Sequence, residues 1–326
     1  MSEGEADGFL QRNLDVLNTV AAALAQTPAG AFSDTGVAGR PLPRLNLSVK
    51  ISALTPAVHP ADSENSLAAL KQRLRPMLRR ATEVGAFINF DRERYQLKDR
   101  TLALFKSILE EPEFRPQPAI GIALQAYLRD RENDLRDLIA WARTNARPLT
   151  VRLVKGASWD YETILARQRD WPVPVWSKKP ESEAHYEKLT LLLLENIDVI
   201  SPAFASLNVR SCAHAIAQAA RLGIDPRADE FQALYGMVDE LKGALLAARP
   251  APGRRQPPHR PRRGSRRPAR RASAHRLHRV HRLARRRFED RGNRRPHPPR
   301  PGQPEKSHLR NGRQKRAHHR PRCGPR

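Results

Sequence analysis

The apolar side chains between residues 45 and 248 change repeatedly from a two-residue period to a helical period, and this alternation limits the fold more than any other feature. The two-residue period is typical of strands and the longer one of amphipathic helices. The expected strands are 45–51, 87–91, 119–127, 149–156, 203–208 and 230–235. The expected helices are 9–26, 63–84, 98–111, 132–145, 181–196, 209–222 and 238–248, with a Pro/Trp-rich loop before 181. Strands that alternate with helices form a parallel sheet, so we expect an α/β fold.

Polar residues in the first four strands favour a barrel over an open sheet. Both folds fit the alternation, but no G-x-G-x-x-G sequence follows the first strand. An open sheet with helices on both faces leaves little room for polar side chains, whereas the mouth of a (βα)8 barrel, at the C-terminal strand ends, has that room. The polar residues near these strand ends are Lys50, Asn89, Asp91, Gln125, Tyr127 and Arg152.

Four of these residues, Lys50, Asp91, Gln125 and Arg152, come from four different strands at matching depth. The residues alone leave two interpretations open. One is a structural cluster of ion pairs that closes the end of a barrel. The other is a site whose fixed cations suit an anionic substrate group, or an electron-rich ring that gains charge on reduction.

The charge of the chain changes sharply near Pro250. Residues 251–326 contain 27 Lys and Arg but three acidic residues, and so carry 24 of the 25 net positive charges. The remainder is nearly neutral and has the composition of a globular protein. Cys212 and Cys323 lie in these two different parts, which indicates no disulfide framework and fits a reducing compartment. No apolar run reaches the ~18 residues of a membrane span, and the start lacks a signal-peptide core.

Seven segments between residues 45 and 248 resemble the proline dehydrogenase family, and most closely the dehydrogenase domain of bacterial bifunctional proline utilization A proteins. They are Leu47-Ser48-Val49-Lys50-Ile51-Ser52, Ile88-Asn89-Phe90-Asp91, Leu124-Gln125-Ala126-Tyr127, Val151-Arg152-Leu153-Val154-Lys155-Gly156-Ala157, Trp159-Asp160-Tyr161-Glu162, Phe204-Ala205-Ser206 and Glu230-Phe231-Gln232-Ala233-Leu234-Tyr235-Gly236-Met237. The resemblance implies a distorted (βα)8 barrel with non-covalent FAD. It also implies oxidation of L-proline to 1-pyrroline-5-carboxylate by hydride transfer to FAD, with electrons passing to a membrane quinone.

The resemblance also implies roles for individual residues. Lys50 and Asp91 match the substrate-side polar pair and are the expected catalytic residues, and Gln125 matches a hydrogen-bond partner of the flavin ring. A guanidinium beside the flavin can favour its reduced form, and an indole can lie against the cofactor. The expected cofactor-binding residues are Gln125, Arg152, Val154, Gly156, Ala157, Trp159 and Ser206. No metal site is expected, because His275, His278 and His281 are interleaved with arginines.

Three departures from the family pattern stand out. Ser158 replaces the usual tyrosine, which removes an aromatic wall of the substrate pocket, and Leu207 replaces the usual histidine. The family continues with a seventh strand and a helix whose paired arginines hold the proline carboxylate. No such motif follows Ala248, so the expected barrel is incomplete after about six βα units.

The expected domains are an N-terminal helix and loop over 1–44, the incomplete barrel over 45–248, and a disordered Arg/Pro-rich tail over 249–326. The tail has three interpretations: a nucleic-acid-binding arm, a basic membrane-surface segment, or a GC-rich coding region translated out of frame. The abrupt change of composition inside a catalytic domain favours the frameshift, so no specific nucleic acid is expected.

The predicted function is proline dehydrogenase in proline catabolism. The alternatives are an inactive truncated barrel and nucleic-acid binding through the tail. The chain as written is expected to be inactive and poorly folded. A quinone acceptor implies a cytoplasmic protein that works at the surface of the inner membrane, and the sequence predicts no oligomeric state.

Overall fold

The computed structural model describes residues 2–26, 43–55, 63–91, 94–115, 119–225, 228–234 and 236–248. These residues all belong to one compact unit, which spans Met1–His278. The expected disordered tail, with its histidines and Cys323, lies outside the described residues.

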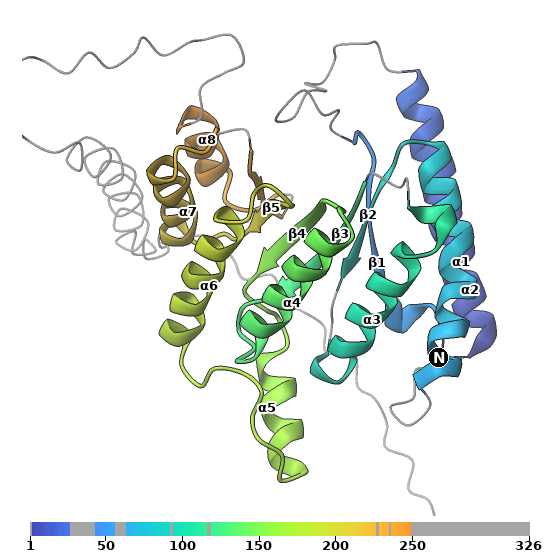
Figure 1. Ribbon diagram of the computed structural model, residues 1–326, viewed down its shortest axis with the longest axis horizontal. Coiled ribbons are helices and arrows are strands. Elements are labelled where there is room, and N and C mark those ends of the chain that lie inside the picture. Colours follow the sequence, from blue (N-terminus) through green and yellow to red (C-terminus); the bar gives the residue numbers. More distant parts are fainter. Residues whose placement is uncertain are drawn as a thin grey trace, which may run out of the picture. The chain divides into compact units, whose positions relative to one another are not determined.

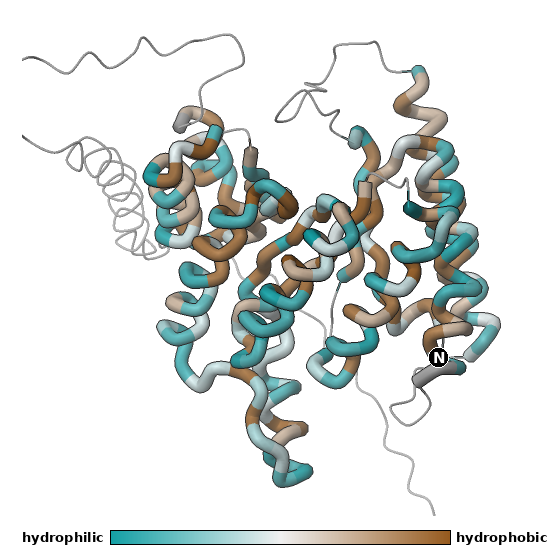
Figure 2. The backbone as a smooth tube through the Cα atoms, viewed as in Figure 1, coloured by the Kyte–Doolittle hydropathy of each residue, from teal (hydrophilic) through white to brown (hydrophobic). Residues whose placement is uncertain are grey.

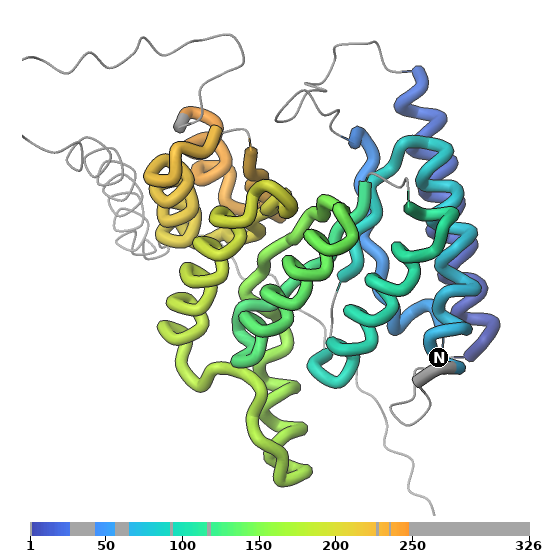
Figure 3. Tube along the Cα trace, in the orientation of Figure 1, coloured from blue at the N-terminus to red at the C-terminus, as the bar shows by residue number. Residues whose placement is uncertain are grey.

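Six parallel strands form one sheet whose spatial order, β1-β2-β3-β4-β5-β6, is the order in the sequence (Figure 1). Consecutive strands therefore lie side by side, and the colours of the trace follow one another along the sheet (Figure 3). A doubly wound sheet reverses its strand order, whereas a barrel does not, so the sheet has the topology of a (βα)8 barrel. The strands are β1 Asn46–Lys50, β2 Phe87–Asp91, β3 Ile120–Gln125, β4 Leu149–Val154, β5 Ile200–Ala205 and β6 Glu230–Gln232.

Helices lie before, between and after the strands, and most of them pack an apolar stripe on one face of the sheet. They are α1 Glu3–Ala25, α2 Ser63–Glu83, α3 Lys98–Leu109, α4 Arg131–Thr144, α5 Trp159–Gln168, α6 Lys179–Leu194, α7 Val209–Arg221 and α8 Asp239–Ala248. Short 3-10 helices occur at Ile51–Ala53, Tyr95–Leu97 and Pro112–Phe114. The helices show alternating hydrophobic and hydrophilic turns (Figure 2), as expected for elements with one face on a core.

The two faces of the sheet differ in chemistry, because successive strand residues point to opposite sides. The apolar face packs under the helices in a single core, in which the rings of Phe90 and Phe105 meet edge to face at 5.2 Å. Its strand residues include Val49, Ile88, Phe90, Ile122, Leu124, Val151, Leu153 and Phe204. The opposite face, called here the inner face, carries Ser48, Lys50, Asn89, Asp91, Gly121, Ala123, Gln125, Thr150, Arg152, Val154, Ala203 and Ala205.

The N-terminal helix begins six residues earlier than its apolar stripe predicts. Ser2 and Glu5 form a capping box, which satisfies the first free N–H groups of α1. Leu17 of this helix is buried in the same core as the strands. Asp7 also pairs with Arg73 of α2 at 2.9 Å. The helix therefore packs as part of the same folded unit.

The structure differs from the sequence-based prediction in two places. No helix was predicted between residue 158 and the Pro/Trp-rich loop, but Trp159–Gln168 forms α5, whose buried residues Glu162, Thr163 and Ala166 are mostly polar. Helix α5 therefore lacks the apolar stripe that reveals a helix. Strand β5 occupies Ile200–Ala205 in place of 203–208. It ends earlier because Asn208 caps α7 by accepting hydrogen bonds from the N–H groups of Arg210 and Ser211.

Candidate active site

An ion pair between β4 and β2 forms the centre of the inner face. Arg152 Nη1 donates to Asp91 Oδ1 at 2.9 Å and to Ser48 Oγ at 2.9 Å. Asn89 Nδ2 donates to the same Asp91 oxygen at 2.8 Å. Lys50 is exposed and is the register partner of Asp91 on the adjacent strand. Two cations and one carboxylate are thus placed together, as the sequence predicts.

Small residues on β3 allow Arg152 to reach Asp91. Arg152 lies on β4 and Asp91 on β2, so the arginine side chain must cross the strand between them. Its register partner on β3 is Ala123, which is preceded on the same face by Gly121. A methyl group at Gly121 would lie 2.6 Å from the Phe87 ring and 2.9 Å from the Thr150 carbonyl. The Phe87 ring and Thr150 therefore pack closely over Gly121, and β3 is buried along its whole length.

The inner face has unused hydrogen-bonding capacity. Asn89 Oδ1 and Arg152 Nε are buried and have no hydrogen-bond partner among the residues that the structure describes. Gln125 is 5% exposed at the end of β3. Buried polar atoms without partners are costly. This part of the sheet is therefore chemically suited to a ligand that supplies donors and acceptors.

The loop after β4 adjoins Gln125. Gln125 and Val154 are register partners, and the N–H of Tyr127 donates to the Lys155 carbonyl at 2.8 Å. Gly156 has a φ of +125°, and a Cβ there would lie 2.4 Å from the Tyr127 ring. Only glycine fits this close approach without strain. The structure thus brings the start of the segment 154–159 beside the end of β3.

The other predicted cofactor residues lie at the same edge of the sheet. Trp159 is the first residue of α5; it is 39% exposed and donates its indole N–H to the Trp176 carbonyl at 2.8 Å. Ala157 is exposed in the loop before it. Ser206 follows Ala205, the register partner of Val154, and its Oγ accepts a hydrogen bond from the Asn208 N–H at 3.2 Å.

Sequence reasoning did not assign Ser48 or Asn89 to the site, although both contact its ion pair. Each lies two residues before a predicted site residue, Lys50 or Asp91, and hence on the same face of its strand. That spacing was the available signal.

Tyr127, beside Gly156, is 3% exposed, and burial raises the pKa of its hydroxyl to about 12.

The profile of the family described as proline dehydrogenase matches residues 1–257. The chain belongs to the proline dehydrogenase family. This result confirms the resemblance predicted from the sequence and, with the six-stranded sheet, the barrel type of fold.

Members of this family that resemble the chain include much longer proteins. Bifunctional protein PutA of Klebsiella aerogenes is 33% identical over 196 residues, which are 60% of this chain and 15% of that protein. Mitochondrial proline dehydrogenase 1 of Arabidopsis thaliana is 28% identical over 195 residues, 58% of this chain and 39% of that protein. The chain thus spans less than half of the length of these relatives.

A solved structure of a family member supports the arrangement of the strands. Proline utilization A from Bdellovibrio bacteriovorus, inactivated by N-propargylglycine, is 42% identical and superposes with a TM-score of 0.74. The match covers 76% of this chain and 26% of that one. In the chain itself, none of the helices among the described residues is both long enough and apolar enough to span a membrane.

A buried histidine behind the site predicts a loss of stability in acid. His185 Nδ1 lies 2.8 Å from the Ala126 carbonyl, directly after β3. Burial holds the pKa of His185 below its ordinary value. Folding therefore favours the neutral ring, and its contribution is complete above about pH 6.5 and is lost as pH falls toward the folded pKa.

We expect the His185→Gln variant to lose this part of the pH dependence, because a neutral amide has no proton to gain. The thermal unfolding midpoint between about pH 7 and pH 5 measures it. His214→Gln, on the neighbouring helix α7, is the matched control. An acid-side decline that is the same in wild type and His185→Gln would contradict the assignment.

Proposed function

We propose that residues 45–248 provide the flavin side and part of the proline site of an L-proline dehydrogenase. The reaction is oxidation of L-proline to 1-pyrroline-5-carboxylate, with FAD as the hydride acceptor. The observation that carries the proposal is the Arg152–Asp91 ion pair beside Lys50, on an inner face with unpartnered polar atoms, in a chain of this family.

The inner face fits a flavin. Gly121 and Ala123 keep the side chains over β3 small, although both residues are buried. The unpartnered Arg152 Nε and the Gln125 amide supply hydrogen-bonding groups there. When bound, FAD supplies the two-electron acceptor that no protein side chain provides. The residues that would hold it are Gln125, Arg152, Val154, Gly156, Ala157, Trp159 and Ser206.

Lys50 and Asp91 would handle the substrate. Proline carries a carboxylate and a protonated ring nitrogen, so a cation and a carboxylate at neighbouring strand ends can orient it by charge. The nitrogen must lose its proton before the adjacent C–H bond can give up a hydride. Asp91, with its oxygen held by Arg152 and Asn89, is placed to fix the orientation of that nitrogen.

Turnover is best tested in a completed barrel. This chimera joins residues 1–248 of this chain to the segment of the Bdellovibrio protein that follows its matched region, so that strands and arginines expected after residue 248 are supplied. We expect it to copurify with FAD and to reduce a dye acceptor when L-proline is added. A quinone in lipid vesicles is the proposed physiological acceptor, and the same assay with such vesicles tests that proposal and the proposed work at the inner membrane.

In the completed barrel, Lys50→Ala and Asp91→Ala should each lower kcat/KM for proline by about a hundredfold or more, because each removes a charge that orients the substrate. Steady-state dye reduction measures this effect. Lys71→Ala and Asp198→Ala are controls that remove one charge from a helix surface or loop. Unchanged proline turnover in both site variants would reject the assigned roles.

For residues 249–326 we propose a change of reading frame near codon 248. The composition of this segment changes within a few residues, inside a region that the family profile matches up to residue 257. Translation of the other two frames should reveal a stretch similar to Tyr-Leu-x-Arg-Arg-x-x-Glu-Asn. If neither frame contains one, a basic arm that binds nucleic acid becomes the better interpretation, and salt-dependent binding to duplex DNA would measure it.

A further inference from the structure

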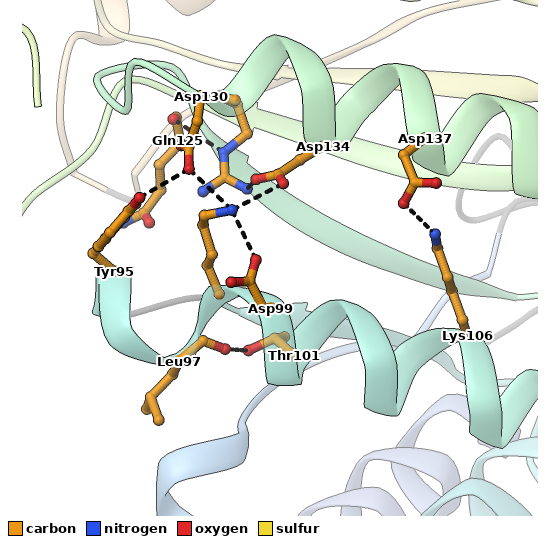
Figure 4. Close-up of polar contacts among 11 residues, drawn as sticks. Tyr95, Leu97, Asp99, Thr101, Lys106, Gln125, Asp130, Asp134 and Asp137 are labelled. Carbon is orange, nitrogen blue, oxygen red and sulfur yellow. Dashed lines mark hydrogen bonds and ion pairs between the residues drawn. The ribbon is translucent and has the colours of Figure 1, made fainter. Parts of the chain in front are cut away.

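A cluster of buried charges lies behind the site, between the first turns of α3 and α4 (Figure 4). Lys98 Nζ lies 2.7 Å from Asp99 Oδ1 and 3.0 Å from oxygens of both Asp130 and Asp134. Arg131 pairs with Asp134 through Nη1. We name the set Tyr95, Lys98, Asp99, Asp130, Arg131 and Asp134 the Lys98–Arg131 cluster. Residues of this kind usually lie at the surface, so their burial requires an explanation.

The two cations and Asp134 are shielded from water, whereas the side chains of Asp130 and Asp99 are 32% and 82% exposed. The side chain of Arg131 is 0% exposed, and those of Lys98 and Asp134 are 9% and 12% exposed. Burial by itself lowers the pKa of Lys98, but hydrogen bonds to its three aspartates raise that pKa above its ordinary value. Lys98 therefore stays an ammonium ion. Removal of one member would leave a buried charge without its partner, which is strongly unfavourable.

The cluster contacts the predicted flavin site through one carbonyl oxygen. Arg131 Nε donates to the backbone carbonyl of Gln125 at 3.4 Å. The same carbonyl accepts the N–H of Leu128 at 3.3 Å. Two donors, one of them a buried guanidinium, thus hold the turn in which β3 ends. The Gln125 side chain leaves the backbone at this turn.

The cluster also connects this turn to two other segments near the site. Tyr95 donates its hydroxyl to Asp130 Oδ2 at 3.0 Å, and its backbone N–H donates to Glu162 Oε1 of α5 at 2.7 Å. Tyr95 follows β2, which ends at Asp91, and α5 begins at Trp159. Segments that follow β2, β3 and β4 are therefore joined by one chain of polar contacts.

We propose that Arg131 is a positioning residue for flavin binding: it fixes the end of β3 so that the Gln125 amide faces the flavin ring. This inference rests on the proposed function. The alternative is that the cluster only staples α3 to α4. A second ion pair between α3 and α4 provides a comparison, because Lys106 also pairs with Asp137, which is 68% exposed (Figure 4). Among the described residues, this second pair contacts no residue of the candidate site.

The first measurement is amide hydrogen exchange of the completed barrel, in which strands expected after residue 248 are supplied. We expect Arg131→Met and Asp134→Asn to speed exchange of the Leu128 N–H by about tenfold or more. Lys106→Met and Asp137→Asn should leave it unchanged. Equal exchange in wild type and Arg131→Met would overturn the proposal.

Arg131→Lys guards against a variant that fails to fold. Lysine keeps a positive charge near Asp134 but lacks the Nε–H group with which Arg131 reaches the Gln125 carbonyl. We expect this variant to fold, with a circular dichroism spectrum like that of wild type, and to show the faster Leu128 exchange. A folded Arg131→Lys with wild-type exchange at Leu128 would also overturn the proposal.

The second measurement is a double-mutant cycle between Arg131 and Gln125 on the FAD dissociation constant of the completed barrel. Arg131→Lys and Gln125→Ala should each weaken binding about tenfold or more. The double variant should match Gln125→Ala within about twofold, because Arg131 acts through that side chain. Multiplied effects would show that Arg131 acts elsewhere and would overturn the inference alone. A wild-type completed barrel that binds no FAD would contradict the proposed function, and the inference with it.

Discussion

The completed barrel should lose FAD when Arg152 is replaced by methionine. Methionine roughly preserves the apolar stem but removes the guanidinium that bonds Asp91 and Ser48 and that would lie beside the flavin. We expect the flavin dissociation constant to rise by about a hundredfold or more, and the flavin absorption band to be absent after gel filtration. Asp91 also loses its partner, so we expect unfolding to become easier by about 1–3 kcal/mol.

Arg136→Met provides the control for this prediction. Arg136 lies on the surface of α4, where it pairs with Glu132 at 2.9 Å, and its side chain is 59% exposed. An exposed pair of this kind contributes little to stability. The control should therefore keep its flavin and its unfolding midpoint. Full flavin content and full turnover in Arg152→Met would show that Arg152 does not serve the cofactor.

The 326-residue chain by itself should show no proline-dependent dye reduction, in contrast to the completed barrel. In the described sheet, β1 and β6 each pair on one side, and unpaired strand edges favour aggregation. Three large apolar side chains after the start of β6 are exposed: those of Leu234, Met237 and Leu246. Domain stability is about 5–15 kcal/mol. Burial of each large aliphatic side chain contributes roughly 1.5–3 kcal/mol, so exposure of a few such side chains would remove most of that stability.

Residues 251–326 carry 24 net positive charges and offer little apolar area. Burial of that area would not offset the chain entropy lost on ordering the segment, so we do not expect it to cover these edges. We therefore expect the unaltered chain to be insoluble or readily cleaved by protease. Side-by-side expression of the chain and the completed barrel, with dye reduction per mole of protein, measures the difference. A soluble, flavin-bound and proline-oxidising product from the unaltered chain would contradict this expectation.

Periodicity along the sequence predicted most of the fold. Strand β2 was expected at residues 87–91 and lies there, because its pattern is bounded by Gly85 and by the next helix. Helix α5 was missed since its buried side is formed by Glu162 and Thr163. These polar residues are buried through contacts such as that of Glu162 with the Tyr95 N–H, which no local pattern contains.

The candidate site was predicted unevenly for the same physical reason. Strand alternation placed Lys50, Asp91 and Arg152 on one face, and the structure joins Asp91 to Arg152 directly. The burial of Arg131 was not predicted. Its partner Asp134 lies on a helix face that charge alone marks as exposed, and Asp134 also pairs with Lys98, which is distant in sequence. The burial of Arg131 therefore depends on how α3 meets α4.

The central claim is that the inner face holds a flavin that accepts a hydride from proline. The most direct measurement is an anaerobic titration of the completed barrel with L-proline, in which the absorption band of oxidised flavin is followed. We predict that the completed barrel binds FAD and loses this band on addition of proline. The Asp91→Ala variant should bind FAD but keep the band at the same proline concentration. A completed barrel that folds but binds no FAD, or whose flavin stays oxidised in excess proline, would contradict the account.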